Sequence, residues 1–134
     1  MARKSLLERL IALPEAERLA QLRKLSDEEK REFRYHWRLW ARDRQLPPDG
    51  DWTTWLIMAG RGFGKTRAGA EWVRAIAQND GSARIALVGA SLVEARSVMV
   101  EGESGLLAIA PRDNRPRFEP SKRLLTWRSG AQAM

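Results

Sequence analysis

The chain has 134 residues, of which 43% are hydrophobic and 31% are charged, and its formal net charge is +7. This length suits about one domain, and the composition excludes a disordered tail and a chain built of membrane spans. There are no cysteines and a single histidine, His36, which excludes a disulfide scaffold, thiol catalysis and a histidine-rich metal site. The first residues lack the apolar core of a secretory signal, so we expect a soluble, cytoplasmic protein whose positive charge suits a polyanionic partner.

Residues 1–44 are predicted to form an α-helical leader. Leucine and isoleucine recur at helical spacing in residues 6–11, and Pro14 suits the start of a second helix. Ser26 and Glu29 have the spacing of a capping box, which predicts a third helix starting after Ser26.

An aromatic stripe follows on that third helix. Phe33, Trp37 and Trp40 stand at positions i, i+4 and i+7, which places them on one helical face. Packing in a core is the favoured interpretation of this stripe, and a base-stacking platform is the alternative.

The middle of the chain is predicted to form a right-handed βαβ unit. Two prolines and a glycine in residues 45–51 end the helices, and the apolar and aromatic run 52–59 is typical of a buried strand in a parallel sheet. A helix is expected over residues 66–78, a second apolar strand over 84–89, and another helix over 92–100.

The last stretch is predicted to be a loop and part of a hairpin. Residues 112–117 are polar and interrupted by proline, which indicates a loop. Residues 124–127 suit a strand, 128–130 a turn and 131–134 the start of the partner strand. Because the sequence stops within this second run, we expect a fragment of a longer protein that folds only marginally by itself.

The segment Ala59-Gly60-Arg61-Gly62-Phe63-Gly64-Lys65-Thr66 is the most informative motif. It matches the phosphate-binding pattern G-x-x-x-x-G-K-[ST], except that Ala59 stands at the first glycine position. Its glycines let the backbone amides point at an anion beside a helix N-terminus. Lys65 is then expected to neutralise the β- and γ-phosphates of ATP, and the Thr66 hydroxyl to ligate Mg²⁺. A glycine-rich turn into an ordinary helix is the alternative.

Two further residue types bear on catalysis. Arg61 within the loop could reach the γ-phosphate as an arginine finger in cis. The alternatives are an arginine that faces solvent or one that pairs with a neighbouring acid. No carboxylate follows an apolar strand downstream of Thr66, so the acid that would hold Mg²⁺ is not found in this sequence. We therefore expect the chain to bind nucleotide but to show no appreciable ATPase or nuclease activity alone.

Three stretches together resemble one protein family. Residues 45–56, residues 60–73 around the loop, and residues 98–107 are similar to the large subunit of phage and gene-transfer-agent terminases, the ATP-driven DNA-packaging motor of tailed phages. The resemblance implies that Arg61 senses or stabilises the γ-phosphate, and that Gln45 recognises adenine through its amide. A plain turn residue before Pro47 is the alternative for Gln45.

The resemblance also implies a full set of site residues and partners. Residues expected to contact ATP are Gln45, Gly60, Arg61, Gly62, Phe63, Gly64, Lys65, Thr66 and Arg67. Of these, Arg61 and Lys65 are the expected catalytic residues, and Thr66 the Mg²⁺ ligand. The implied partners are double-stranded DNA, the terminase small subunit, the portal protein and further copies in a ring, with no membrane.

The predicted fold class is therefore α/β, with a partial P-loop NTPase-type parallel sheet in residues 45–134 behind the helical leader. In the full-length protein, this domain would couple ATP hydrolysis to DNA translocation, and a nuclease domain that is absent here would cut the DNA. A P-loop DNA helicase or repair ATPase fragment, and a non-enzymatic remnant of a truncated reading frame, are the alternatives.

Overall fold

The computed structural model describes residues 6–134, and the burial of side chains from Glu8 onward. Residues 1–5, where a secretory signal would begin, and the predicted stripe side chains of Leu6 and Leu7 lie outside this description. The chain forms two compact units, one ending at Arg42 and the other spanning Asp43–Met134.

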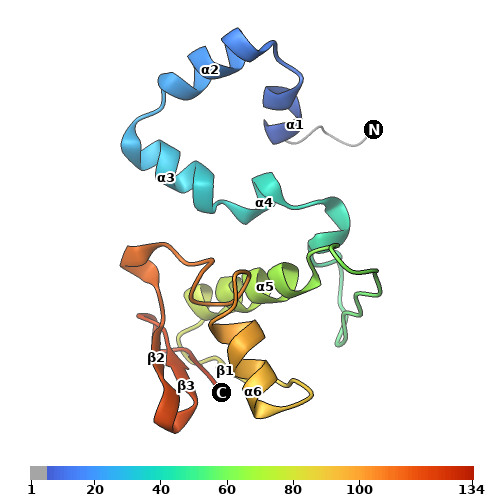
Figure 1. Cartoon of the computed structure of the whole chain (residues 1–134), viewed down its shortest axis with the longest axis vertical. Helices are drawn as coiled ribbons and strands as arrows, with labels where there is room; N and C mark the ends of the chain where they lie inside the picture. Colours follow the sequence, from blue (N-terminus) through green and yellow to red (C-terminus); the bar gives the residue numbers. More distant parts are fainter. Residues whose placement is uncertain (1–5) are drawn as a thin grey trace. The chain divides into compact units, whose positions relative to one another are not determined.

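The first unit is a series of short helices (Figure 1). These are α1 (Leu6–Ile11), α2 (Glu15–Arg23), α3 (Asp27–Tyr35) and α4 (Trp37–Trp40).

Two local devices shape these helices. The predicted capping box is confirmed: the Glu29 amide donates to Ser26 Oγ at 3.1 Å, and the Ser26 amide donates to Glu29 Oε2 at 2.7 Å. These contacts lower the pKa of the Glu29 carboxyl below its usual value. The hydrogen bond from the Ser26 backbone N–H has the larger effect, and the Ser26 side chain adds to it. Arg18 Nη2 donates to the carbonyls of Ile11 and Leu13, both at 3.1 Å, and so ties α2 to the end of α1.

The aromatic stripe does not lie on one continuous helix, as the spacing had predicted. His36 takes a non-helical conformation, with φ −82° and ψ 87°, and separates α3 from α4. Trp40 Nε1 instead donates to the Phe33 carbonyl at 2.8 Å, and the two rings meet edge to face at 5.2 Å. Trp40 is 45% exposed and Phe33 half-buried, so these side chains pack on each other rather than in a buried core.

The second unit is α/β, as expected from the sequence. Its helices and helical turns are η1 (Asp43–Gln45), α5 (Lys65–Asn79), α6 (Leu92–Glu94), the π-helical η2 (Ala95–Val100), η3 (Arg112–Asn114) and η4 (Pro120–Lys122). Its strands are β1 (Arg84–Ile85), β2 (Arg117–Glu119), β3 (Leu124–Thr126) and β4 (Gln132–Ala133).

The four strands form one mixed sheet in the order β1-β4-β3-β2. Strand β4 pairs in parallel with β1 and antiparallel with β3, and β2 pairs antiparallel with β3. The predicted hairpin of residues 124–134 is confirmed, with Gly130 in the left-handed region at φ 100°. The prediction of a loop over residues 112–117 misses the start of β2 at Arg117.

The predicted strand over residues 52–59 is wrong, and so is the βαβ unit built on it. This segment pairs with no strand of the described sheet, and β1 pairs with β4 instead. Leu56 is 74% and Met58 84% exposed, while Ile57 between them is half-buried. A strand is defined by hydrogen bonds to a neighbour, and apolar composition alone cannot supply that neighbour.

Helix α5 packs against the sheet and carries the centre of the core (Figure 1). Its buried side chains Ala70, Val73 and Ala77 belong to one cluster with residues of η2, the following loop and the β3–β4 hairpin. Leu106, Ile109 and Leu125 are almost completely enclosed in that cluster, and the larger Trp127 beside them is 3% exposed. The first residues of α5 do not belong to this cluster, so the glycine-rich loop precedes a helix whose later turns are packed in the core.

Candidate functional site

The glycine-rich loop lies directly before α5 and is shaped by left-handed backbone conformations. Gly62 has φ 78°, and Gly64, the N-cap of α5, has φ 87°. Only glycine adopts such angles without a steric cost, so these two positions explain why the motif needs glycines there. A Cβ atom at Gly60 or Gly62 would meet nothing within 4 Å, so this face of the loop is open.

Lys65 folds its side chain back over the loop. Its Nζ donates to the Ala59 carbonyl at 2.5 Å and to the Gly60 carbonyl at 3.2 Å. The ammonium group of this exposed side chain therefore lies beside Ala59 and Gly60, at the start of the loop, which we call the loop mouth. Ala59 stands at the first position of the motif.

The first turn of α5 presents backbone N–H groups without a side-chain cap. The N-cap residue is Gly64, and the first ladder bond runs from the Ala68 amide to the Gly64 carbonyl at 2.9 Å. The first amides of a helix have no acceptor within the helix, and the helix dipole adds partial positive charge there. Lys65 and Thr66 at this turn, and Arg61 in the loop, are exposed.

Gln45 contacts the loop backbone and is only 6% exposed. Its Nε2 donates to the Phe63 carbonyl at 3.2 Å and to the Gly64 carbonyl at 3.3 Å. The structure therefore brings Gln45 together with the loop, 18 residues further along the chain. The predicted adenine contact stays a prediction.

Arg67, in the first turn of α5, belongs to an ion-pair cluster. The carboxylate of Glu71, a residue only 4% exposed, accepts hydrogen bonds from Arg67 Nε at 3.0 Å and from Arg74 Nη1 at 3.2 Å, and Arg67 Nη2 lies 2.8 Å from Glu71 Oε1. Arg67 is among the residues expected from the sequence to contact ATP and Glu71 is not, although the i,i+4 and i,i+3 spacings around Glu71 are those of helical ion pairs.

A tryptophan cluster holds the segment before the loop. The rings of Trp52, Trp55 and Trp72 contact one another, with centroids 6.1–6.3 Å apart. Trp72 belongs to α5, and Trp52 Nε1 donates to the Pro48 carbonyl at 2.8 Å. Aromatic packing on α5 thus anchors residues 52–55, where sequence analysis had placed strand pairing.

The predicted Mg²⁺ ligand, Thr66, is exposed at the second position of α5. Within residues 6–134, no three histidine, cysteine or acidic side chains gather as a metal-binding group.

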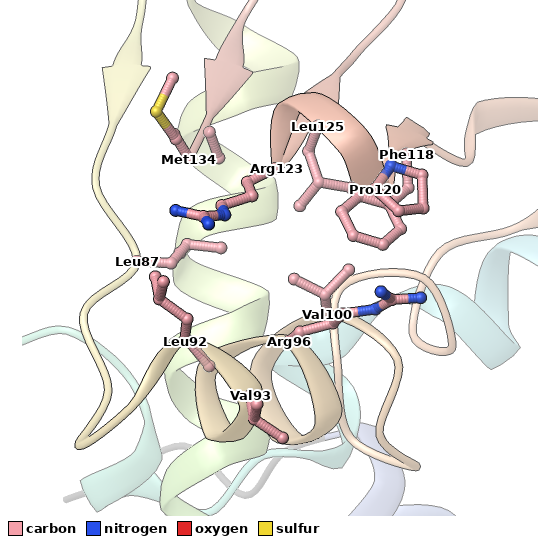
Figure 2. A pocket seen from close by; sticks show the side chains of 12 residues that line it. Leu87, Leu92, Val93, Arg96, Val100, Phe118, Pro120, Arg123, Leu125 and Met134 are labelled. Carbon is pink, nitrogen blue, oxygen red and sulfur yellow. The ribbon is translucent and has the colours of Figure 1, made fainter.

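A separate apolar groove of about 410 Å³ lies beside the sheet. Side chains of α6, η2, the β2–β3 hairpin, the chain after β1 and the end of β4 line it. Figure 2 shows Arg123 between Leu87 and Met134 in this groove. None of the residues predicted to bind nucleotide lines it.

Across the described part of the chain, no helix has both the length and the apolar character needed to cross a membrane. A family model described as "Terminase large subunit, T4likevirus-type, N-terminal" matches residues 56–134, which is more than half of the chain. No curated protein and no solved structure matches the chain. The matched stretch contains the glycine-rich loop from Gly60 onward, α5 and the whole sheet. The resemblance drawn from the motif residues is thereby confirmed, and the chain belongs to the family of terminase large subunits, of which it carries an N-terminal part.

Proposed function

We propose that residues 59–66 bind the triphosphate of ATP with Mg²⁺, and that the chain is the nucleotide-binding part of a DNA-packaging motor. The observation that carries this proposal is the uncapped N-terminus of α5 behind an open glycine loop, with the Lys65 ammonium at the loop mouth. Backbone N–H groups, a helix dipole and a lysine in this order suit a polyphosphate anion. Membership of the terminase family supports ATP as the nucleotide.

The residues around the loop fit the roles that such a site requires. Lys65 leaves the Ala59 and Gly60 carbonyls and pairs with the β- and γ-phosphates, and the exposed Thr66 hydroxyl is a ligand for Mg²⁺. Arg61 is exposed on the loop, where its guanidinium can extend toward the γ-phosphate. When bound, Mg²⁺ supplies positive charge to the phosphate oxygens.

The remaining contacts of the proposed site come from the loop backbone and its first helical turn. They involve Gly60, Gly62, Phe63, Gly64 and Arg67. In the full-length protein, the parallel β1–β4 pair would extend into a larger sheet of the P-loop NTPase type, with the antiparallel β2–β3 hairpin at its side.

For the whole motor, we propose ATP-driven translocation of double-stranded DNA into a procapsid and cutting of the DNA by a nuclease domain. Portal protein, terminase small subunit and ring-forming copies of the same chain are its proposed partners. All of them meet in the cytoplasm of the infected cell. These assignments rest on the family and not on a described contact.

Calorimetric titration with Mg²⁺ and a non-hydrolysable ATP analogue tests the site. Replacing Lys65 with alanine removes the ammonium group at the loop mouth, so we expect Lys65→Ala to weaken binding about 10- to 100-fold. Lys122→Ala is the matched control, because Lys122 lies in η4 and pairs with Glu119 at 2.9 Å. Equal affinity of the wild type and Lys65→Ala would refute the assignment, and an equal loss in both variants would indicate unspecific charge attraction.

A further inference from the structure

Gln45 donates hydrogen bonds to the loop backbone, a contact different from the adenine contact expected from the sequence. A side-chain amide has two N–H hydrogens, and the Nε2 group of Gln45 faces two carbonyls, those of Phe63 and Gly64, at 3.2 and 3.3 Å. Recognition of adenine by an amide uses an N–H toward N7 and the carbonyl toward N6. To read adenine, this buried side chain would therefore have to give up a contact with the loop.

The two carbonyls held by Gln45 determine the direction of two loop amides. A trans peptide is planar, and its N–H points opposite to its C=O. Neither peptide is cis, so fixing the Phe63 carbonyl fixes the Gly64 N–H, and fixing the Gly64 carbonyl fixes the Lys65 N–H. Both N–H groups then point away from Gln45.

The same contact bears on the start of α5. The Gly64 carbonyl also accepts the first ladder bond of the helix, from the Ala68 amide at 2.9 Å. Gly64 lies in the left-handed region at φ 87°, and Gln45 gives its carbonyl a second donor from outside the helix. Burial keeps water from competing for the Gln45 amide.

We propose that Gln45 is a positioning residue for the phosphate loop, which orients the Gly64 and Lys65 amides toward the anion and does not select the base. This inference rests on the proposed nucleotide site. It predicts that loss of Gln45 weakens every triphosphate ligand by the same factor, whatever base the ligand carries.

The first arm of the test needs no ligand. Gln45→Met keeps the length of the side chain and removes both N–H donors, and Gln45→Glu keeps its shape and presents oxygens to the carbonyls. In both variants, we expect hydrogen exchange by NMR to show about tenfold lower protection of the Ala68 amide. Protection of the Asp80 amide, which bonds to Ile76 at 2.9 Å at the other end of α5, should stay unchanged. Unchanged protection at Ala68 would overturn the inference.

The second arm measures the affinity for ATP, GTP and inorganic tripolyphosphate, each with Mg²⁺, in the wild type, in Gln45→Met and in the control Gln21→Met on exposed α2. We expect Gln45→Met to weaken all three ligands about tenfold, with their ratios unchanged. A loss confined to ATP would overturn the positioning role in favour of base recognition. If the wild type binds none of the three, the proposed function fails, and the exchange arm alone decides whether Gln45 holds the loop.

Discussion

Glu71 carries a buried carboxylate between two arginines of its own helix. The side chain of Arg67 is 35% exposed and that of Arg74 13% exposed, so both guanidinium groups keep some contact with water while Glu71 has almost none. Burying a charge costs free energy unless it is paired, and here the two cations flank the two carboxylate oxygens. The cluster therefore fixes the direction in which Arg67 leaves the first turn of α5.

Replacing Glu71 should destabilise the second unit. Glu71→Ala removes the buried carboxylate that both guanidinium groups contact, and we expect a loss of about 1–3 kcal/mol in the free energy of unfolding. Arg67→Ala keeps the pair of Glu71 with Arg74 and should cost less. Urea denaturation followed by circular dichroism measures both, with Glu28→Ala on the exposed side of α3 as the control. A Glu71→Ala midpoint equal to that of the wild type would contradict a stabilising cluster.

At the scale of elements, α5 is joined to the sheet through a tight turn. The Asp80 carboxylate accepts from the Ser82 hydroxyl at 2.6 Å and from the Ser82 amide at 2.9 Å, and these two bonds lower the pKa of Asp80. Gly81 between them faces the β3–β4 turn, where a Cβ atom would overlap the backbone carbonyl oxygen of Ser129. The turn thus allows a close approach that only glycine permits.

Two glycine-to-alanine changes should therefore act in opposite directions. Gly81→Ala forces the Ser129 backbone to move and should destabilise the protein by about 1–3 kcal/mol. Gly69 lies within α5 with nothing within 4 Å of an added Cβ, so Gly69→Ala should stabilise it by about 0.5–1 kcal/mol through helix propensity. Thermal melting of the two variants beside the wild type measures the pair. A melting temperature below that of the wild type for Gly69→Ala would contradict open space at Gly69. An unchanged melting temperature for Gly81→Ala would contradict the close approach to Ser129.

At the scale of the whole molecule, the two units differ in how they bury apolar surface. No residue between Glu8 and Arg42 is buried, whereas the second unit has a continuous cluster of buried side chains from α5, η2 and the hairpin. Burial of apolar surface is the main stabilising contribution to folding, so the second unit holds most of the stability.

Hydrogen exchange across the full chain should separate these two units. We expect amides in α2 and α3 to exchange at least about tenfold faster than amides in the central turns of α5 and in β3, because helices without burial open locally. Mass spectrometry of peptic fragments after deuterium labelling measures this difference. Equal protection in α2 and α5 would mean that the first unit is stabilised as strongly as the core.

Short-range physics made much of this protein predictable from sequence. The Ser26–Glu29 capping box, the helix after Gly64 and the hairpin turn ending at Gly130 involve residues only a few positions apart. Their conformations follow from hydrogen bonds and glycine angles that the residue types themselves require. The glycine-rich loop and the terminase resemblance belong to this class, because both depend on contiguous motifs.

Tertiary structure alone decided the pairing of strands and the contacts of Gln45. Residues 52–59 have strand composition but stay unpaired in the described sheet, while the short β4 takes the position between β1 and β3. Likewise, the sequence places Gln45 before two prolines, yet only the fold brings its amide to the Phe63 and Gly64 carbonyls. Such partners lie far apart along the chain, and which of them meet depends on how the whole core packs, which no local pattern of residues encodes.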